Sequence, residues 1–218
     1  MQNDNNNKPG DIFNIDENTS NTVVLRQERD TFYKDKGVDF VKSYYAEDGV
    51  NEWKDPTTSR KVFFEILNNI KYTGNEVFMD CGCGLGHVVF LASHVFQKVI
   101  GIELLETVFN ECEKNIKLLF PNGYSNIDLI QGDMLIIDDH TIDNVNVFYF
   151  SCPFNDLNKF RQWIDKITLS FLRKKRKIYF IYYYPLFESE MANSIFTLNA
   201  TINTIGKVNI YSVPHEEK

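Results

Sequence analysis

Apolar residues gather in five short runs, and each run ends in polar residues or glycine. A short apolar run that stops at such a boundary is typical of a buried strand. The runs cover residues 77–80, 98–103, 127–134, 145–150 and 178–184.

Apolar side chains also recur at three- and four-residue spacing between these runs, which predicts amphipathic helices. The helical segments are 60–70, 87–96, 105–119 and 157–171. Strands that alternate with helices form a parallel sheet. At the end of the chain, residues 196–205 and 208–213 flank Gly206 and predict an antiparallel pair instead.

A glycine loop follows the first run. Asp80 is followed by glycines at alternate positions, Gly82, Gly84 and Gly86, and then by the helical segment. Glycine allows positive φ and close approach of a ligand to the main chain, so strand, glycine turn and helix predict a nucleotide-type binding element. The dinucleotide pattern G-x-G-x-x-G does not fit, because His87 stands where its third glycine would fall.

Two acids end the next two strands. Glu103 lies about 20 residues after the first glycine, where an acid in nucleotide folds accepts hydrogen bonds from ribose hydroxyls. Asp133 ends the third strand. Taken alone, Glu103 is also a good helix-start acid and Asp133 a good turn former. Their order along the chain supports the ligand interpretation.

These motifs together resemble those of class I S-adenosylmethionine-dependent methyltransferases, including uncharacterised bacterial members and seven-strand protein-lysine methyltransferases. The resemblance implies an α/β fold: a Rossmann-like, seven-stranded, mostly parallel sheet with helices on both faces and an antiparallel C-terminal hairpin. It also implies S-adenosyl-L-methionine as cofactor, with Asp133 facing its adenine. The implied cofactor-binding residues are Asp80, Gly82, Cys83, Gly84, Gly86, Glu103, Asp133 and Met134.

The fourth strand runs into Ser151-Cys152-Pro153-Phe154, which resembles the family pattern [DNS]-P-P-[FYW] except at Cys152. The resemblance implies that these four residues are the catalytic loop. Ser151 would accept a hydrogen bond from the target nitrogen, and Phe154 would pack on that nitrogen. A second register aligns Cys152-Pro-Phe154 with the Asn-Pro-Phe motif of a group of bacterial methyltransferases, which puts Cys152 where asparagine is usual. Cys152 as a covalent nucleophile is a further alternative, although pyrimidine carbon methyltransferases with a cysteine here carry Pro-Cys. A core role is the alternative for Phe154.

Three regions are expected along the chain: a disordered polar tail at 1–28, an N-terminal helical lid at 29–58 and the methyltransferase domain at 59–218. The turn at Asp55-Pro-Thr-Thr58 also resembles seven-strand protein-lysine methyltransferases. We therefore favour N-methylation with a protein lysine as acceptor. A small-molecule methyltransferase and an inactive cofactor-binding partner subunit are the alternatives.

Net charge and one basic run indicate which classes of partner the chain could bind. A net charge of −7 weighs against nucleic acid, whose binding depends on Lys and Arg neutralising phosphates. The basic run Arg173-Lys-Lys-Arg-Lys177 precedes the fifth strand, and we expect it to be a solvated loop, with a nuclear address or a nucleic-acid patch as the alternative.

Location and metal binding are also addressed by the sequence. The polar start and the lack of a long apolar run predict no signal peptide and no membrane span, so we expect a cytoplasmic protein. Cys81 and Cys83 have no second Cys/His pair at zinc spacing, so no metal site is expected.

Overall fold

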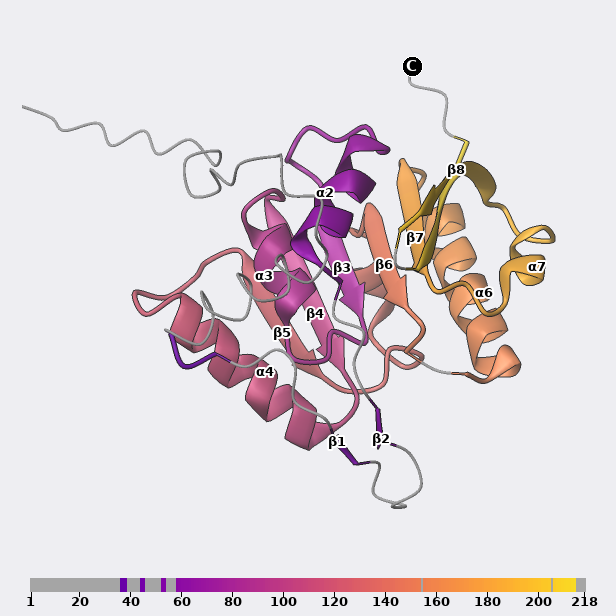
Figure 1. Ribbon diagram of the computed structural model, residues 1–218. Coiled ribbons are helices and arrows are strands. Elements are labelled where there is room, and N and C mark those ends of the chain that lie inside the picture. Colours follow the sequence, from indigo (N-terminus) through magenta and orange to yellow (C-terminus); the bar gives the residue numbers. More distant parts are fainter. Residues whose placement is uncertain are drawn as a thin grey trace, which may run out of the picture.

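The computed structural model describes residues 36–38, 44–45, 52–53, 58–153, 155–204 and 206–214. Its centre is a seven-stranded sheet in the order β5-β4-β3-β6-β7-β9-β8 (Figure 1). The strands are β3 (Val77–Cys81), β4 (Lys98–Glu103), β5 (Ile127–Gln131), β6 (Val147–Ser151), β7 (Ile178–Tyr183), β8 (Thr197–Asn203) and β9 (Lys207–Val213).

Strands β3 to β7 pair in parallel, and β9 pairs antiparallel with both β7 and β8. The predicted terminal hairpin is therefore confirmed, and so is the mostly parallel seven-stranded sheet.

Helices cover both faces of the sheet. Apolar side chains of α2 (Arg60–Asn68), α3 (His87–Ser93) and α4 (Glu106–Leu119) pack on one face. Those of α5 (Asp139–Ile142), α6 (Leu157–Arg173) and α7 (Glu188–Met191) pack on the other. Successive strand residues alternate between the two cores, as Phe78 and Met79 do.

Helix α6 illustrates how sequence produces an element. Asp156 precedes it, and its carboxylate accepts hydrogen bonds from the backbone N–H groups of Asn158 and Lys159 at 2.8 and 3.1 Å. Phe160 and Trp163 lie on its buried face, and fully burying an apolar side chain of this size contributes on the order of 2 kcal/mol. The helix ends at Arg173, after which the chain turns into β7.

The prediction of a helical lid at 29–58 is wrong for two of its segments. Tyr44–Tyr45 (β1) and Glu52–Trp53 (β2) form a two-stranded antiparallel sheet instead of helix. Aromatic residues favour strands, and three of these four residues are aromatic. The predicted tail at 1–28 and most of the lid at 29–58 lie outside the described residues.

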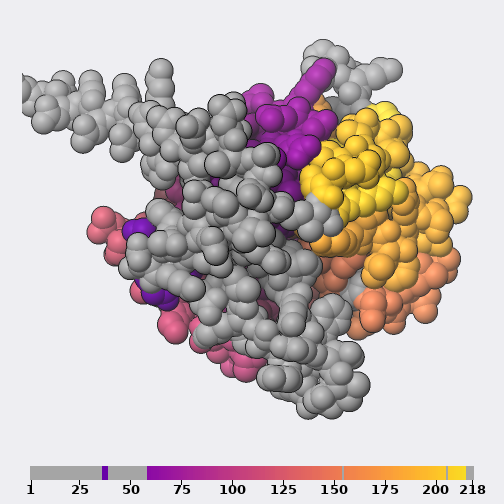
Figure 2. Space-filling view, viewed as in Figure 1, coloured from indigo at the N-terminus to yellow at the C-terminus, as the bar shows by residue number. Residues whose placement is uncertain are grey.

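The C-terminal strands close one side of the molecule. Figure 2 shows them in yellow beside the violet segment that contains α2, and Ile202 of β8 shares a core with Phe63 of α2. In the described part of the chain, no helix is both long enough and apolar enough to cross a membrane.

Candidate cofactor and acceptor site

The loop after β3 has backbone angles that its three glycines make possible. Gly82 and Gly86 have φ of +78° and +89°, a region that side chains with a Cβ seldom adopt. Space is also restricted. A Cβ at Gly82 would lie 2.6 Å from Cβ of Pro153, and one at Gly86 would lie 2.7 Å from Sγ of Cys112. Both positions therefore require glycine.

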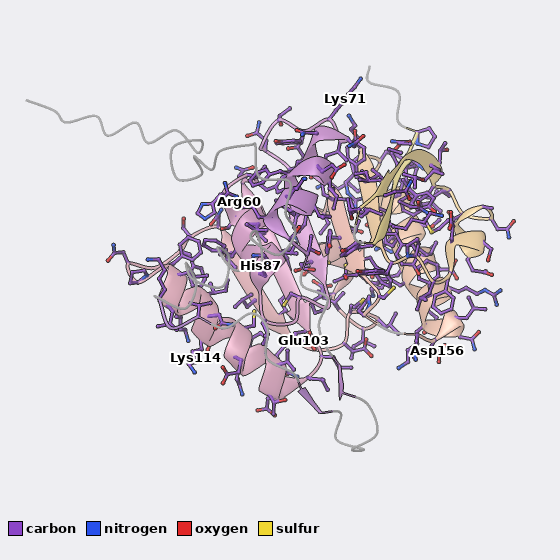
Figure 3. All side chains as sticks on the ribbon, in the orientation of Figure 1. Arg60, Lys71, His87, Glu103, Lys114 and Asp156 are labelled. Carbon is purple, nitrogen blue, oxygen red and sulfur yellow. The ribbon has the colours of Figure 1, made fainter. Side chains whose placement is uncertain are left out.

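Hydrogen bonds tie this loop to β4. The N–H groups of Gly82 and Cys83 both donate to the carbonyl of Ile102, at 3.0 and 2.9 Å. The N–H of Gly84 donates to Oε2 of Glu103 at 3.0 Å, and that of Leu105 donates to Oε1 at 3.0 Å. The predicted acid is thus in direct contact with the predicted glycine loop, and Figure 3 labels Glu103 near the carboxyl ends of the strands.

Asp80 and Cys83 have different surroundings. Asp80 is buried and stands in register between Gly101 of β4 and Tyr149 of β6. Cys83 points into the core, where its Sγ lies 3.9 Å from Sγ of Cys112. This hydrogen bond, together with burial, raises the pKa of the Cys83 thiol well above its usual value. The side chain of Cys83 is therefore a neutral core group.

Asp133 and Met134 follow β5 beside the same edge. The N–H of Gly132 donates to the carbonyl of Glu103 at 2.9 Å, which holds the two acidic segments together. Oδ1 of Asp133 accepts from the N–H of Leu135 at 2.8 Å, as a turn former does. This bond occupies one carboxylate oxygen, so it is compatible with the ligand interpretation. Met134 is buried in the core under the other face of the sheet.

The predicted acceptor loop lies next to the glycine loop. Ser151 ends β6 in register with Tyr183 of β7. Pro153 lies against Gly82. Phe154 lies outside the described residues. Ser151 and Pro153 are therefore beside the glycine loop, as expected from the order of the strands.

Cys152 is held by the neighbouring strand. Its Sγ donates to the carbonyl of Tyr184 at 2.5 Å and lies 3.5 Å from that of Tyr183. Burial raises the pKa of the Cys152 thiol. A protonated thiol that donates to a carbonyl is a poor nucleophile, so this geometry argues against a covalent role for Cys152.

Sequence reasoning missed a buried hydroxyl pair. Thr58 Oγ1 and the hydroxyl of Tyr149 are hydrogen-bonded, and both residues are almost completely buried. The bond joins the segment before α2 to β6, two residues before Ser151. A tyrosine within an otherwise apolar run was the only signal for it in the sequence.

Comparisons with known proteins agree with this geometry. The family described as Histone methylation protein DOT1 matches residues 57–127. The precorrin-6y C5,15-methyltransferase of Geobacter metallireducens is 13% identical, with a TM-score of 0.57 over 77% of this chain and 95% of that one. An RNA methyltransferase of Salinibacter ruber, solved with S-adenosyl-L-homocysteine, is 17% identical. Its TM-score is 0.53 over 74% of this chain and 95% of that one. The chain has the class I S-adenosylmethionine-dependent methyltransferase fold.

Curated relatives of this methyltransferase fold share a shorter stretch. An uncharacterised RNA methyltransferase of Clostridium acetobutylicum is 37% identical over 76 residues, which are 35% of this chain and 16% of the relative. An uncharacterised RNA methyltransferase of Staphylococcus epidermidis is 26% identical over 104 residues, which are 47% of this chain and 23% of the relative. The chain thus spans less than a quarter of the length of these two relatives.

These names correct one expectation. Net charge argued against nucleic acid as a partner, yet curated proteins similar to this chain are named RNA methyltransferases. The expectation against nucleic acid is therefore wrong as a general exclusion. The physical reason is that net charge describes the whole chain, whereas a nucleic-acid contact depends on local charge and shape.

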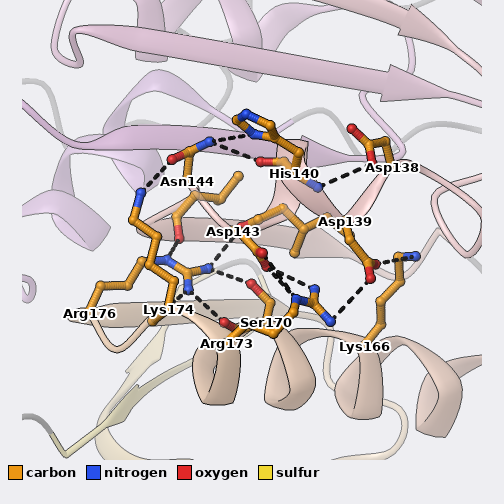
Figure 4. Close-up of polar contacts among 12 residues, drawn as sticks. Asp138, Asp139, His140, Asp143, Asn144, Lys166, Ser170, Arg173, Lys174 and Arg176 are labelled. Atoms are coloured by element: carbon orange, nitrogen blue, oxygen red, sulfur yellow. Dashed lines mark hydrogen bonds and ion pairs between the residues drawn. The ribbon is translucent and has the colours of Figure 1, made fainter.

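The basic run is not a solvated loop throughout. Arg176 is 8% exposed and shortly precedes β7, so it lies at the N-terminal edge of the sheet. Figure 4 shows its polar contacts with the segments around it. Its guanidinium donates to the carbonyls of Val145 at 2.7 Å and Ile142 at 2.8 Å, and to Oγ of Ser170 at 2.9 Å. Desolvation lowers the pKa of Arg176 to about 10, so it still carries its charge at neutral pH.

Its neighbours in the run are also engaged with the protein. Arg173 binds Asp143 through two nitrogens, with contacts of 2.8 to 3.2 Å, and Lys174 donates to Oδ1 of Asn144 at 2.6 Å. The run therefore fastens α6 to the segment around α5. Among the described residues, no group of three or more His, Cys, Asp or Glu side chains could hold a metal ion.

Proposed function

We propose that the chain is an S-adenosylmethionine-dependent methyltransferase that transfers the methyl group directly to a nitrogen of its substrate. The contact between Gly82 and Pro153 carries the proposal, because it joins the glycine loop to the loop after β6. A methyl transfer needs the cofactor and the acceptor to be aligned within a few ångströms. Two loops in contact at one edge of the sheet support that arrangement.

The residues present fit the cofactor. An ionised carboxylate offers about four acceptor positions, and backbone N–H groups occupy one on each oxygen of Glu103. Two positions then remain for the two ribose hydroxyls. Asp133 would face the adenine, and the main chain of Gly82 to Gly86 would lie along the methionine part. When bound, S-adenosylmethionine supplies a methyl group on a positively charged sulfur.

The acceptor side supports direct transfer. Ser151 carries a hydroxyl that can accept a hydrogen bond from an amine and so orient its lone pair. Cys152 donates a hydrogen bond to the carbonyl of Tyr184, just after β7, which disfavours an enzyme-bound intermediate. The nucleophile would then come from the substrate, and the protein would align it and exclude water.

Two acceptor classes are supported, each by one comparison. The match to a histone methylation family favours a protein lysine. The names of the curated relatives favour RNA. Transfer to a nitrogen needs no covalent cysteine for either acceptor, so we place the lysine first on the family match and RNA second.

Cofactor binding and acceptor use can be tested separately. Calorimetry with S-adenosyl-L-homocysteine tests the cofactor site, and NAD serves as the control ligand. Methyl-labelled cofactor is then incubated with core histones and, in parallel, with total bacterial RNA. We expect the protein to bind S-adenosyl-L-homocysteine and not NAD. We also expect the labelled methyl group to appear in either the histones or the RNA. Tight NAD binding without any response to S-adenosyl-L-homocysteine would overturn the proposal.

The role of Cys152 has its own test. Cys152→Ser keeps a donor toward the Tyr184 carbonyl, so turnover on the accepted substrate should stay within about threefold of the parent, a small effect in free energy. Loss of activity, together with a trapped protein–substrate adduct in the parent, would indicate covalent catalysis instead.

A further inference from the structure

Two cysteines, Cys83 and Cys112, meet behind the glycine loop and form what we call the sulfur pair. Cys83 belongs to that loop, Cys112 belongs to α4, and both side chains are buried. Their Sγ atoms are 3.9 Å apart, although the two residues are 29 positions apart in the chain. Both are free thiols. A single buried cysteine usually serves as a small apolar side chain, whereas two thiols in contact also have the composition of a reduced disulfide.

Two glycines leave room for the sulfur pair. A Cβ at Gly86 would lie 2.7 Å from Sγ of Cys112, and a Cβ at Gly101 would lie 3.2 Å from Sγ of Cys83. Both distances are shorter than an ordinary van der Waals contact. Each sulfur therefore occupies space that a side chain at a neighbouring glycine would fill, and the two sulfurs face each other between the loop and the helix.

The turn of α4 that carries Cys112 also supports the loop by a hydrogen bond. Nδ2 of Asn115 donates to the carbonyl of Leu85 at 3.2 Å, and the side chain of Asn115 is buried. Helix α4 has 14 residues, and hydrogen bonds along its backbone make it the stiffer of the two partners. A shorter distance between the sulfurs would therefore move the loop more than the helix.

The loop is bonded to β4 at the residues next to the sulfur pair. The N–H of Cys83 donates to the carbonyl of Ile102 at 2.9 Å. The N–H of Gly84 donates to Oε2 of Glu103 at 3.0 Å. A displacement of Cys83 therefore reaches the carboxylate that we assign to the ribose through a single residue.

We propose that Cys83 and Cys112 form a reversible disulfide that displaces the glycine loop and weakens cofactor binding. This inference rests on the proposed function, because it takes the glycine loop as the cofactor site. An S–S bond is about 2.05 Å long, so the sulfurs at 3.9 Å must approach each other by nearly half of their separation. Oxidising conditions would then switch the methyltransferase off, and reducing conditions would restore it.

The oxidation is a thiol–disulfide exchange with oxidised glutathione. Two S–H bonds break and one S–S bond forms between Cys83 and Cys112. The two electrons and two protons pass to oxidised glutathione, which is cleaved into two molecules of reduced glutathione. Hydrogen bonding to Cys112, together with burial, raises the pKa of the Cys83 thiol, so the reactive thiolate is scarce at pH 7. The exchange is therefore slow, and its equilibrium is the quantity to measure.

The experiment equilibrates the full chain in mixtures of reduced and oxidised glutathione, with and without saturating S-adenosyl-L-homocysteine. Intact mass shows the loss of two hydrogens, and peptide mapping shows which cysteines are linked. Calorimetry then compares S-adenosyl-L-homocysteine affinity of the reduced and oxidised forms. The variants are Cys112→Ala, which removes the pair, and Cys81→Ala as the matched control, because Cys81 lies in the core under the other face of the sheet.

We expect one disulfide, between Cys83 and Cys112, and an affinity at least tenfold lower in the oxidised parent, restored by dithiothreitol. Coupling is reciprocal, so saturating S-adenosyl-L-homocysteine should favour the reduced pair by the same factor. A tenfold factor raises the reduction potential by about 30 mV. Oxidation should leave the affinity of Cys112→Ala within twofold, and it should still lower that of Cys81→Ala. If Cys112→Ala fails to fold, the closer substitute Cys112→Ser replaces it.

Two results would overturn the inference. One is a parent in which Cys83 and Cys112 remain unlinked in fully oxidised glutathione. The other is a linked parent whose affinity for S-adenosyl-L-homocysteine is unchanged. Either result would leave the sulfur pair as core packing alone.

Failure of the proposed function gives a different result. The reduced parent would then bind no S-adenosyl-L-homocysteine, which would remove both the cofactor site and its control by oxidation. A reduced parent that binds S-adenosyl-L-homocysteine, with no effect of oxidation, would retain the methyltransferase proposal and reject only the disulfide.

Discussion

The two edges of the same sheet are built in opposite ways. At the N-terminal edge, Arg176 lies among backbone carbonyls and Arg173 is ion-paired with Asp143. At the C-terminal edge, the chain bends through positive φ at Gly82, Gly84 and Gly86, and again at Cys152 and Tyr184. One edge is rich in satisfied polar contacts, and the other is rich in unusual backbone conformations.

This contrast indicates a division of labour. Hydrogen bonds to a buried guanidinium stabilise the packing of α6 on the segment around α5, at the edge of the sheet opposite the glycine loop. Unusual backbone angles at the other edge cost stability, and they are retained where they bring loops together. If this is correct, changes at the C-terminal edge should affect ligand binding, and changes at the N-terminal edge should affect folding.

The largest effect on binding is expected for Gly82→Val. The new side chain would collide with Pro153, and a branched residue resists φ +78°. Affinity for S-adenosyl-L-homocysteine should fall at least a thousandfold, about 4 kcal/mol. The matched control is Gly123→Val, which has φ +87° but no atom within 4 Å of an added Cβ. Calorimetry should show parent-like binding for the control, and parent-like binding for Gly82→Val would place the cofactor elsewhere.

The largest effect on stability is expected for Arg176→Met. The change leaves the carbonyls of Val145 and Ile142 without their donor, and we expect about 3 kcal/mol of destabilisation in urea unfolding. Affinity for S-adenosyl-L-homocysteine in the folded protein should be unchanged. Lys175→Met removes a charge next to the Phe171 ring and should cost less than about 1 kcal/mol. A tenfold drop in affinity for Arg176→Met at a concentration where it is folded would show that the two edges are coupled.

Glu103→Ala should have a smaller effect on binding. It removes the carboxylate that accepts from Gly84 and Leu105 and that we assign to the ribose. Charge-assisted hydrogen bonds contribute roughly 1.5 to 3 kcal/mol each, so affinity for S-adenosyl-L-homocysteine should drop at least tenfold. The exposed Glu106 in the first turn of α4 provides the control Glu106→Ala. Equal dissociation constants for the parent and a folded Glu103→Ala would mean that the ribose is bound by other groups.

The smallest effect concerns pH and the N-terminal edge. Hydrogen bonding to Arg173 lowers the pKa of Asp143. A carboxyl whose folded pKa lies below its unfolded value of about 3.9 stabilises the fold above that value. This contribution is lost as the pH falls through the folded pKa. Asp143→Asn should therefore reduce the loss of melting temperature between pH 5 and pH 2, by the equivalent of less than about 1 kcal/mol.

A matched variant checks whether that acid effect is specific. Asp128 pairs with Lys98, and its side chain is 55% exposed, so Asp128→Asn should follow the acid melting curve of the parent. Identical curves for Asp143→Asn and the parent would show that the Arg173 pair adds no measurable stability.

Much of the fold could be predicted because its signals are local. The apolar runs of β3, β4, β6 and β7 and the spacing of α6 are visible in short windows of sequence. Helical expectations failed at Tyr44–Tyr45 and Glu52–Trp53, which form strands. Those segments are too short for a period to develop, so aromatic strand preference and pairing decided their structure.

The site was predicted less completely. Asp80, the glycines, Glu103 and Asp133 were identified from order and spacing, and their role in binding stays a prediction. Cys83 was included with them, yet its side chain packs against Cys112. The bond between Thr58 and Tyr149 and the contact of Cys152 with Tyr184 were missed, because each joins residues at least 30 positions apart.

By itself, the sequence determined the alternation of strands and helices and the glycine loop, and it predicts the edge of the sheet where a ligand would bind. These properties follow from apolar periodicity and from the few residues that accept positive φ, which act within a few positions of the chain. The tertiary structure alone decided that Arg176 is buried and that Cys152 donates a hydrogen bond to the carbonyl of Tyr184, just after a neighbouring strand. Those properties depend on which strands become neighbours and in what register, and burial then sets the protonation and hydrogen bonding of each side chain.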